Sequence, residues 1–301
     1  MQPAIVPLAE FARTMGQAPE RPVWALPQSA PPLSLDRGGV RLRVEDVVDT
    51  VVALQRAEWL QDGVYVGPRG GQEVYRDVLR ASRRLEVSVP PALLTAGVMK
   101  QMQAAGTDVR PFLVLSSYFM QSADPDERRF VIGRLMGHIA ASQVTPTSLY
   151  RLLVDHGGVR QVARRAVGPV LEVVLAPVGL GLRLALSRWH RAAELTADRA
   201  GLLCCGSVEQ ARRAMLRIAL SIQPQVDPEV YLDQLRGSAD DASPGRWAEL
   251  LASEPWMHKR MRHLQLFADS ALYSELSGRP TTGLLGRDEL ERQTSLLLGV
   301  S

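Results

Sequence analysis

The chain has 301 residues, of which 46% are hydrophobic and 22% are charged, and a formal net charge of +3. This length suits one large domain or two small ones with a sizeable core, and the composition is typical of a soluble globular protein. The basic residues are almost all arginine, with lysine only at Lys100 and Lys259, and no basic run is interleaved with aromatic residues. Composition therefore argues against a nucleic-acid-binding protein.

The first 40 residues contain many prolines and are expected to form an extended arm, with one short helix near residues 9–15. The N-terminus has neither a basic n-region nor a clean apolar h-region, so no secretory signal is expected. Residues 41–276 are expected to form the domain, followed by a linker and a helix in residues 277–301. The arm could be a tail, a strap over the domain or a partner-binding segment, and the sequence leaves these three open.

The next segments predict a mixture of helices and strands. Residues 44–60 have apolar side chains at helical spacing and predict an amphipathic helix, and residues 72–85 predict another. Residues 93–99 and 112–118 are the strand candidates. With the helices that follow, this pattern predicts an α+β fold that is mostly helical and has a small β-sheet.

The local chemistry of residues 124–127 predicts the start of a helix. Asp124 is a good N-cap, Pro125 fits the first helical position, and Glu127 is placed to complete a capping box. This helix should run to about Gln143. Further helices are predicted to begin at Thr145, Ser207 and Asp227, and the last to span residues 288–298.

The most apolar stretch, residues 167–186, has nearly the length of a membrane span, about 20 residues. It contains Glu172, Arg183 and two prolines, so a buried or surface-packed helical hairpin is expected instead. The adjacent Cys204 and Cys205 are poorly placed for a disulfide with each other, which favours a reducing compartment. We therefore expect a cytoplasmic, bacterial protein, with a position peripheral to the inner membrane as the alternative.

Two segments carry the most informative pattern: residues 130–142, FVIGRLMGHIAAS, and residues 187–202, SRWHRAAELTADRAGL. The second has Glu194 and Asp198 one helical turn apart. This pair resembles the zinc metallopeptidases of the HtpX and CAAX-prenyl-protease type (gluzincins), whose first helix reads hGHELGHh, with h apolar, and whose second ends in ExxAD. The resemblance covers residues 72–270 and implies a metallopeptidase-like domain with an active-site helix.

The resemblance also shows which chemistry is missing. Where the family has His-Glu-x-x-His, this chain has Arg134, Leu135 and, at the last position, His138. A guanidinium has no lone pair to donate to zinc and a leucine accepts no proton, so the first metal ligand and the general base are lost. By the resemblance, His138 and Glu194 are the remaining ligand positions, and Asp198 is the carboxylate behind them.

A third departure lies near residues 253–260. There the family has a Ser/Thr-His-Pro motif followed by an arginine. In this chain the histidine is replaced by Glu254, and Arg260 matches the arginine. Two further histidines nearby, His258 and His263, are expected at the surface or at an interface.

His190 could rebuild a metal site. It precedes Glu194 by four residues, so both side chains project from one helix face. With His138 they would supply three ligands, although no general base. No cofactor is expected unless zinc binds this altered site.

Arg134 is the other candidate for a new role. Loss of zinc would leave Glu194 and Asp198 as a partly buried pair of carboxylates without a countercharge, which is energetically costly. We predict that Arg134 occupies the electrostatic place of the metal, by a fork to Glu194, to Asp198 or to both. The alternative is that Arg134 points to solvent. Without the resemblance, the two acids would be an ordinary solvated or salt-bridged pair, and His138 a core residue.

The function that these observations predict is that of a pseudoenzyme. Such a protein would bind a protein or an extended peptide, for example along a strand edge, as scaffold, regulator or adaptor. Two alternatives stay open: a zinc metallopeptidase with an altered site, and a membrane-associated assembly factor that uses residues 167–186. The sequence indicates no oligomeric state.

Overall fold

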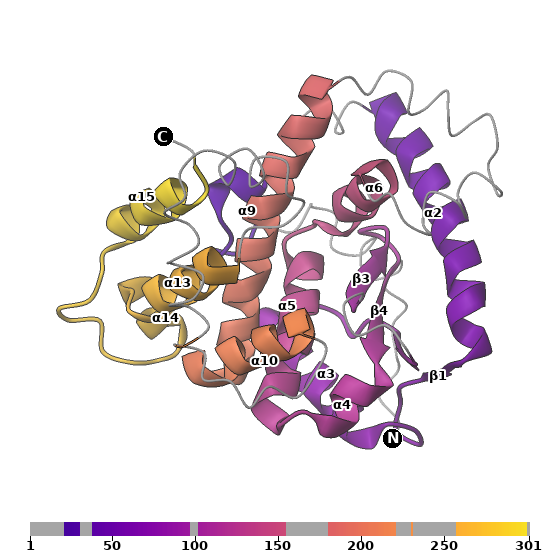
Figure 1. Cartoon of the computed structure of the whole chain (residues 1–301), viewed down its shortest axis with the longest axis horizontal. Coiled ribbons are helices and arrows are strands. Elements are labelled where there is room, and N and C mark those ends of the chain that lie inside the picture. Colours follow the sequence, from indigo (N-terminus) through magenta and orange to yellow (C-terminus); the bar gives the residue numbers. More distant parts are fainter. Residues whose placement is uncertain are drawn as a thin grey trace.

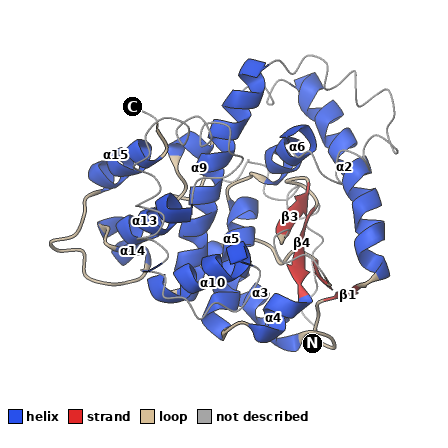
Figure 2. Ribbon diagram, in the orientation of Figure 1, coloured by secondary structure: helices blue, strands red, loops and turns tan. Residues whose placement is uncertain are grey.

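The computed structural model describes residues 21–30, 38–96, 102–154, 180–220, 230 and 257–299. Helices surround one small sheet (Figures 1 and 2), so the predicted α+β, mostly helical fold is confirmed. In chain order the elements are the 3-10 helix η1 (Pro27–Ser29), α2 (Gly38–Gln61), β1 (Gly63–Tyr65), α3 (Gln72–Leu85), β2 (Ala92–Thr95), β3 (Gln103–Gly106), β4 (Pro111–Ser116), α4 (Ser117–Ser122), α5 (Pro125–Ala140), α6 (Val144–Val154), α9 (Leu180–Cys205), α10 (Val208–Leu220), α13 (Met257–Ala268), α14 (Ala271–Leu276) and α15 (Arg287–Leu297).

The sheet has the strand order β1-β2-β4-β3, with β2 and β4 parallel and the two outer pairs antiparallel. Sequence analysis anticipated β2 and β4 but missed β1, which has three residues, and β3, whose sequence QAAG contains no β-branched or aromatic residue. The strand predicted over residues 112–118 ends at Ser116. There the hydroxyl of Ser116 accepts a hydrogen bond from the Phe119 amide and so begins α4.

The central strand β4 is buried along its whole length, and its side chains alternate between two cores. Leu113 and Leu115 join the main core with residues of α3 and α5, whereas Phe112 and Val114 pack with residues of α2 and α6. Figure 1 shows the result: the sheet lies between α2 on one side and the α5–α9 pair on the other.

The two helices that carry the predicted site pack very closely, because small residues face each other. A Cβ atom added at Gly133 would lie 2.5 Å from the Cβ of Cys204, and one at Gly137 would lie 2.4 Å from the Cβ of Ala200. In the same way, Gly201 of α9 leaves room for the ring of Phe130. Side chains next to these contacts, on either helix, are therefore within reach of each other.

The local signals at the helix ends are mostly confirmed. In α5 the Asp124 amide donates to Glu127 Oε2 at 3.1 Å, as the capping box requires. The helix ends at Ala140 and not near Gln143, and Ser142 has a left-handed backbone with φ of 53°. The hydroxyl of Ser207 accepts a hydrogen bond from the Gln210 amide at the start of α10.

Both ends of the described chain lie against α9. The amide of Leu26 donates to Thr196 Oγ1 at 3.1 Å, and Glu291 of α15 pairs with Arg199 of α9 at 3.0 Å. The described part of the predicted arm, residues 21–30, is thus arranged as a strap over the domain, and we call it the strap. The short helix expected at residues 9–15 lies outside the described residues, and of the helix expected after Asp227 only Val230, which is helical, is described.

No helix in the described part of the chain has the length and apolar character needed to cross a membrane. The apolar stretch at residues 167–186 lies mostly outside the described residues, since α9 begins at Leu180.

Candidate functional site

Arg134 of α5 reaches across to both acids of α9. Its Nε donates to Asp198 Oδ1 at 2.9 Å, and its Nη2 donates to Glu194 Oε2. Both carboxylates are almost fully buried, at 2% and 0% exposure, and the Arg134 side chain is 12% exposed. Of the arrangements that the sequence left open, the structure has the fork to both acids.

A second arginine completes the group from another helix. Arg260 of α13 contacts Asp198 through two hydrogen bonds, from Nε to Oδ2 at 2.9 Å and from Nη2 to Oδ1 at 2.7 Å. We call Arg134, Glu194, Asp198 and Arg260 the charge cluster. It contains two guanidinium groups and two carboxylates, so its formal charges balance without any further ion.

Leu135, at the position of the family's general base, has no group that can accept a proton. Leu135 is 1% exposed and belongs to the main hydrophobic core. Glu254, the third departure from the family pattern, lies outside the described residues.

His138 is buried, and its tautomer is fixed by a chain of hydrogen bonds. Gln143 donates through Nε2 to the Ser29 carbonyl at 3.2 Å, so its Oε1 accepts from His138 Nδ1 at 3.0 Å. His138 Nε2 therefore carries the lone pair, and it lies 3.5 Å from Glu194 Oε1. Burial, reinforced by the charge of Arg134, lowers the pKa of His138 well below its usual value, so the ring is neutral.

His190 lies beside the same oxygen, as the four-residue spacing predicted. Its Nε2 is 3.6 Å from Glu194 Oε1, and its ring stacks on Tyr150 with a centroid distance of 4.2 Å. Burial and the nearby charges of Arg151 and Arg134 lower the pKa of His190 well below its usual value. Its Nδ1 is buried and has no hydrogen-bond partner among the described residues.

These residues do not fit a catalytic zinc ion of the kind that the resemblance implies. A guanidinium stands at the first ligand position, and Glu194 already accepts its hydrogen bond. A divalent cation added to a balanced cluster would leave two buried positive charges uncompensated. Within the described residues, no group of three or more His, Cys, Asp or Glu side chains is arranged to hold a metal ion.

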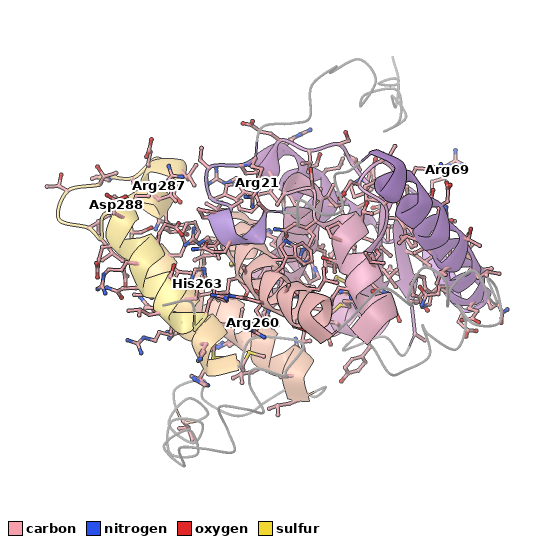
Figure 3. The ribbon with its side chains drawn as sticks, turned by 90° about the horizontal axis from the view of Figure 1, so that it is seen from above. Arg21, Arg69, Arg260, His263, Arg287 and Asp288 are labelled. Atoms are coloured by element: carbon pink, nitrogen blue, oxygen red, sulfur yellow. The ribbon has the colours of Figure 1, made fainter. Side chains whose placement is uncertain are left out.

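Two residues of this region escaped the sequence analysis. Gln143 was expected only as the end of a helix, and nothing in its spacing indicates a contact with His138. His263 was expected at a surface or interface, which is wrong: it is fully buried and accepts a hydrogen bond from Arg199 Nε at 3.1 Å. Its spacing of three residues from Arg260 on α13 places both side chains toward α9, where Figure 3 labels them.

Comparison with known proteins places this geometry in a family. The family model for peptidase family M48 matches residues 72–267, which span α3, the strands β2 to β4, the α5–α9 pair and the whole charge cluster. Neither the characterised proteins nor the solved structures that were compared with the chain give a match. Because the family model covers well over half of the sequence, the chain belongs to peptidase family M48.

Proposed function

We propose that this protein is an M48-family pseudoenzyme that binds no zinc and acts by binding another protein or an extended peptide, as scaffold or regulator. The observation that carries the proposal is the position of Arg134, which bridges Glu194 and Asp198. A permanent cation thereby stands where the family's metal chemistry would need an open ligand position and a bound water.

The charge cluster supports a structural role for this arginine. All four side chains are buried or nearly so, and each carboxylate is paired with at least one guanidinium. Breaking a buried pair by removal of one partner costs about 3–5 kcal/mol, because the other charge remains buried. Side chains that are paired this strongly with each other are not available to contact a substrate.

The loss of the base supports the same conclusion. Peptide hydrolysis of the family's type needs a group that takes a proton from water near the metal. Leu135 cannot do so, and both carboxylates of the charge cluster already accept hydrogen bonds from arginine.

A second candidate, a metal ion in an altered site, is favoured by one observation. The Nε2 atoms of His138 and His190 lie 3.5 and 3.6 Å from Glu194 Oε1. Two ligand atoms bound to tetrahedral zinc are separated by a similar distance, about 3.4 Å. The positive charges of Arg134 and Arg260 oppose this candidate, and it too lacks a base.

The sheet offers limited support for binding along a strand edge. One edge strand, β3, has α6 beside it, and the Gly106 carbonyl accepts a hydrogen bond from Ser148 of α6. The other edge strand, β1, exposes Val64 and Tyr65 but has only three residues. Binding of a long extended peptide therefore needs a different surface, to which we return below.

Metal content tests the proposal directly. The protein is expressed with added zinc, dialysed gently and analysed by mass spectrometry, in parallel with the double variant Arg134→His/Leu135→Glu, which restores the family's motif. The parent should hold no more than about 0.1 zinc per chain, and the double variant should approach about one. About one zinc in the parent, lost on His190→Ala, would instead establish the altered site and overturn the proposal.

A further inference from the structure

The strap contacts α9 through its backbone, as a bound peptide contacts a receptor. The Leu26 amide donates to Thr196 Oγ1 at 3.1 Å, and the same hydroxyl donates to Ser29 Oγ at 2.8 Å. Thr196 and Ser29 are both fully buried. One threonine of α9 thus holds two points of the strap.

Carbonyl groups of the strap are held by three more side chains. The Ser29 carbonyl accepts from Trp189 Nε1 at 3.1 Å and from Gln143 Nε2 at 3.2 Å. The Trp24 carbonyl accepts from Arg199 Nη1 at 3.2 Å. Side chains of a folded domain that bind the backbone groups of a short segment are typical of peptide recognition.

Two apolar side chains anchor the strap. Trp24 is 5% exposed and joins the main core, and Leu26 is fully buried with Ala192, Leu195 and, from the C-terminal end, Leu298. A buried tryptophan and a buried leucine surrounded by polar contacts are the pattern of an interface whose binding energy lies in a few residues.

Hydrogen bonds within the strap also fix its shape. Arg21 donates through Nη2 to the Leu26 carbonyl at 2.9 Å and to Ser29 Oγ at 2.8 Å, and Figure 3 shows Arg21 above this turn. The Ala25 amide donates to the Pro22 carbonyl at 2.9 Å. A segment that is preorganised in this way loses less conformational entropy when it binds, so it makes a good ligand.

We infer that the surface of α9 under the strap is a peptide-binding groove, that the strap is its resident ligand, and that a partner protein displaces the strap with a segment of the pattern Trp-x-Leu-x-x-Ser that adopts the same turn. This inference rests on the proposed protein-binding function and names the surface for it. The polar side chains of the groove are buried and need partners, so any occupant must present an amide and two carbonyls as the strap does.

The covalent connection of the strap sets a threshold for the partner. A segment that is tethered by a short linker competes at an effective concentration on the order of millimolar. A partner segment must therefore bind better than the strap, or bind elsewhere on the protein as well, before it takes the groove.

Exchange of the segment in the groove would change the surroundings of His138, which lies beside Glu194 of the charge cluster. Gln143 is held by the Ser29 carbonyl, and Gln143 in turn fixes the tautomer of His138 beside Glu194. When the strap leaves, the amide of Gln143 is free to turn, and His138 loses its fixed tautomer. The nitrogen chemical shifts of His138 therefore report which segment occupies the groove.

The test is an exchange experiment on the folded protein. A protease site is introduced within residues 31–37, the full chain is purified and then cut, and a fluorescent peptide of residues 21–30 is added. We expect the labelled peptide to enter the groove, with a rise in anisotropy and with His138 nitrogen shifts like those of the uncut protein, and the unlabelled peptide to compete. The matched control, the same peptide with Leu26→Asp, should not enter, because its carboxylate would be buried.

Two results would overturn the inference. The first is a cut, folded protein that takes up no peptide within a day at a peptide concentration of about 1 mM, the effective concentration of the tether. The second is unfolding of the domain as the strap dissociates, because the strap would then be part of the permanent core. Either result, with zinc absent from the parent, leaves protein binding to another surface and so separates the two proposals.

Discussion

Helix α9 contributes to two buried clusters that contain arginine, and the two clusters compensate the buried guanidinium charge in different ways. In the charge cluster, Arg134 and Arg260 are balanced by two carboxylates. Arg199, the residue that follows Asp198, is fully buried but has mostly neutral partners: the Trp24 carbonyl, His263 and Thr294.

Among the described residues, the second cluster, which we call the Arg199 cluster, has one carboxylate that offsets the charge of the guanidinium. Glu291, which is 22% exposed, pairs with Arg199 at 3.0 Å, and the ring of Phe267 lies under the guanidinium at 5.0 Å. Burial lowers the pKa of Arg199 from its usual value, and Glu291 only partly opposes this. The difference teaches that one helix can hold one buried arginine by charge and another mostly by neutral acceptors, where both ends of the described chain meet.

The largest effect is expected for a substitution in the charge cluster. Arg134→Ala leaves Glu194 and part of Asp198 buried without countercharge, so the free energy of unfolding should fall by about 3–5 kcal/mol. Urea unfolding followed by circular dichroism measures the change. Arg134→Lys, which keeps the charge but not the fork, should recover part of the loss. An Arg134→Ala protein that unfolds like the parent would show that the arginine does not take the place of a metal.

A smaller loss of stability is expected for a substitution in the Arg199 cluster. Arg199→Met keeps the length of the side chain and removes its hydrogen bonds to the strap and α15, so stability should fall by about 2–3 kcal/mol. The strap should also become accessible, and limited proteolysis should cut near Trp24 before it cuts the domain.

The matched control for Arg199 is Glu291→Gln. This acid is partly exposed, so its removal should cost less than about 1 kcal/mol. A loss as large as that of Arg199→Met would mean that the cluster depends on charge after all, and the contrast with the charge cluster would not hold.

The smallest effect appears as a pH dependence. Burial, and then the charge of Arg199, lowers the pKa of His263 well below its usual 6.5. As the pH falls below this value, the unfolded chain binds a proton that the folded chain excludes, so stability is present above about pH 6.5 and is lost toward lower pH. Each such histidine contributes a slope of up to about 1.4 kcal/mol per pH unit.

His263→Gln should therefore reduce the slope of stability between about pH 6 and pH 5 by that amount. Urea midpoints measured across the pH range provide the test, and values near pH 8, where both proteins are neutral at this position, show the cost of the substitution itself. An unchanged slope would mean that His263 takes up its proton in the folded protein too.

The sequence predicted much of the framework because the signals were local. The capping box at Asp124 and Glu127 needs only neighbouring residues, and the start of α10 after Ser207 is equally local. The strand β1 was missed because it has three residues, and β3 because it contains no β-branched or aromatic residue, so the position of both depends on partners elsewhere in the sheet.

The site divides in the same way. Motif spacing identified Arg134, His138, His190 and Glu194 as candidate site residues. Whether Arg134 reaches the acids depends on how closely α5 and α9 approach, and that distance is set by glycines such as Gly137 facing small residues of the other helix. The roles of Gln143 and His263 could not be predicted, because their partners are far away along the chain or belong to segments without a motif.

The arrangement at Arg134 has one further consequence, for how the protein matures. A site built on a free ion is complete only after the ion has been delivered, and its occupancy follows the supply of metal in the cell. Here the cations are the Arg134 and Arg260 side chains, so the charge cluster is assembled as soon as α5, α9 and α13 pack. The charge cluster then depends only on the amino-acid sequence, so chelators or metal starvation should leave it unchanged.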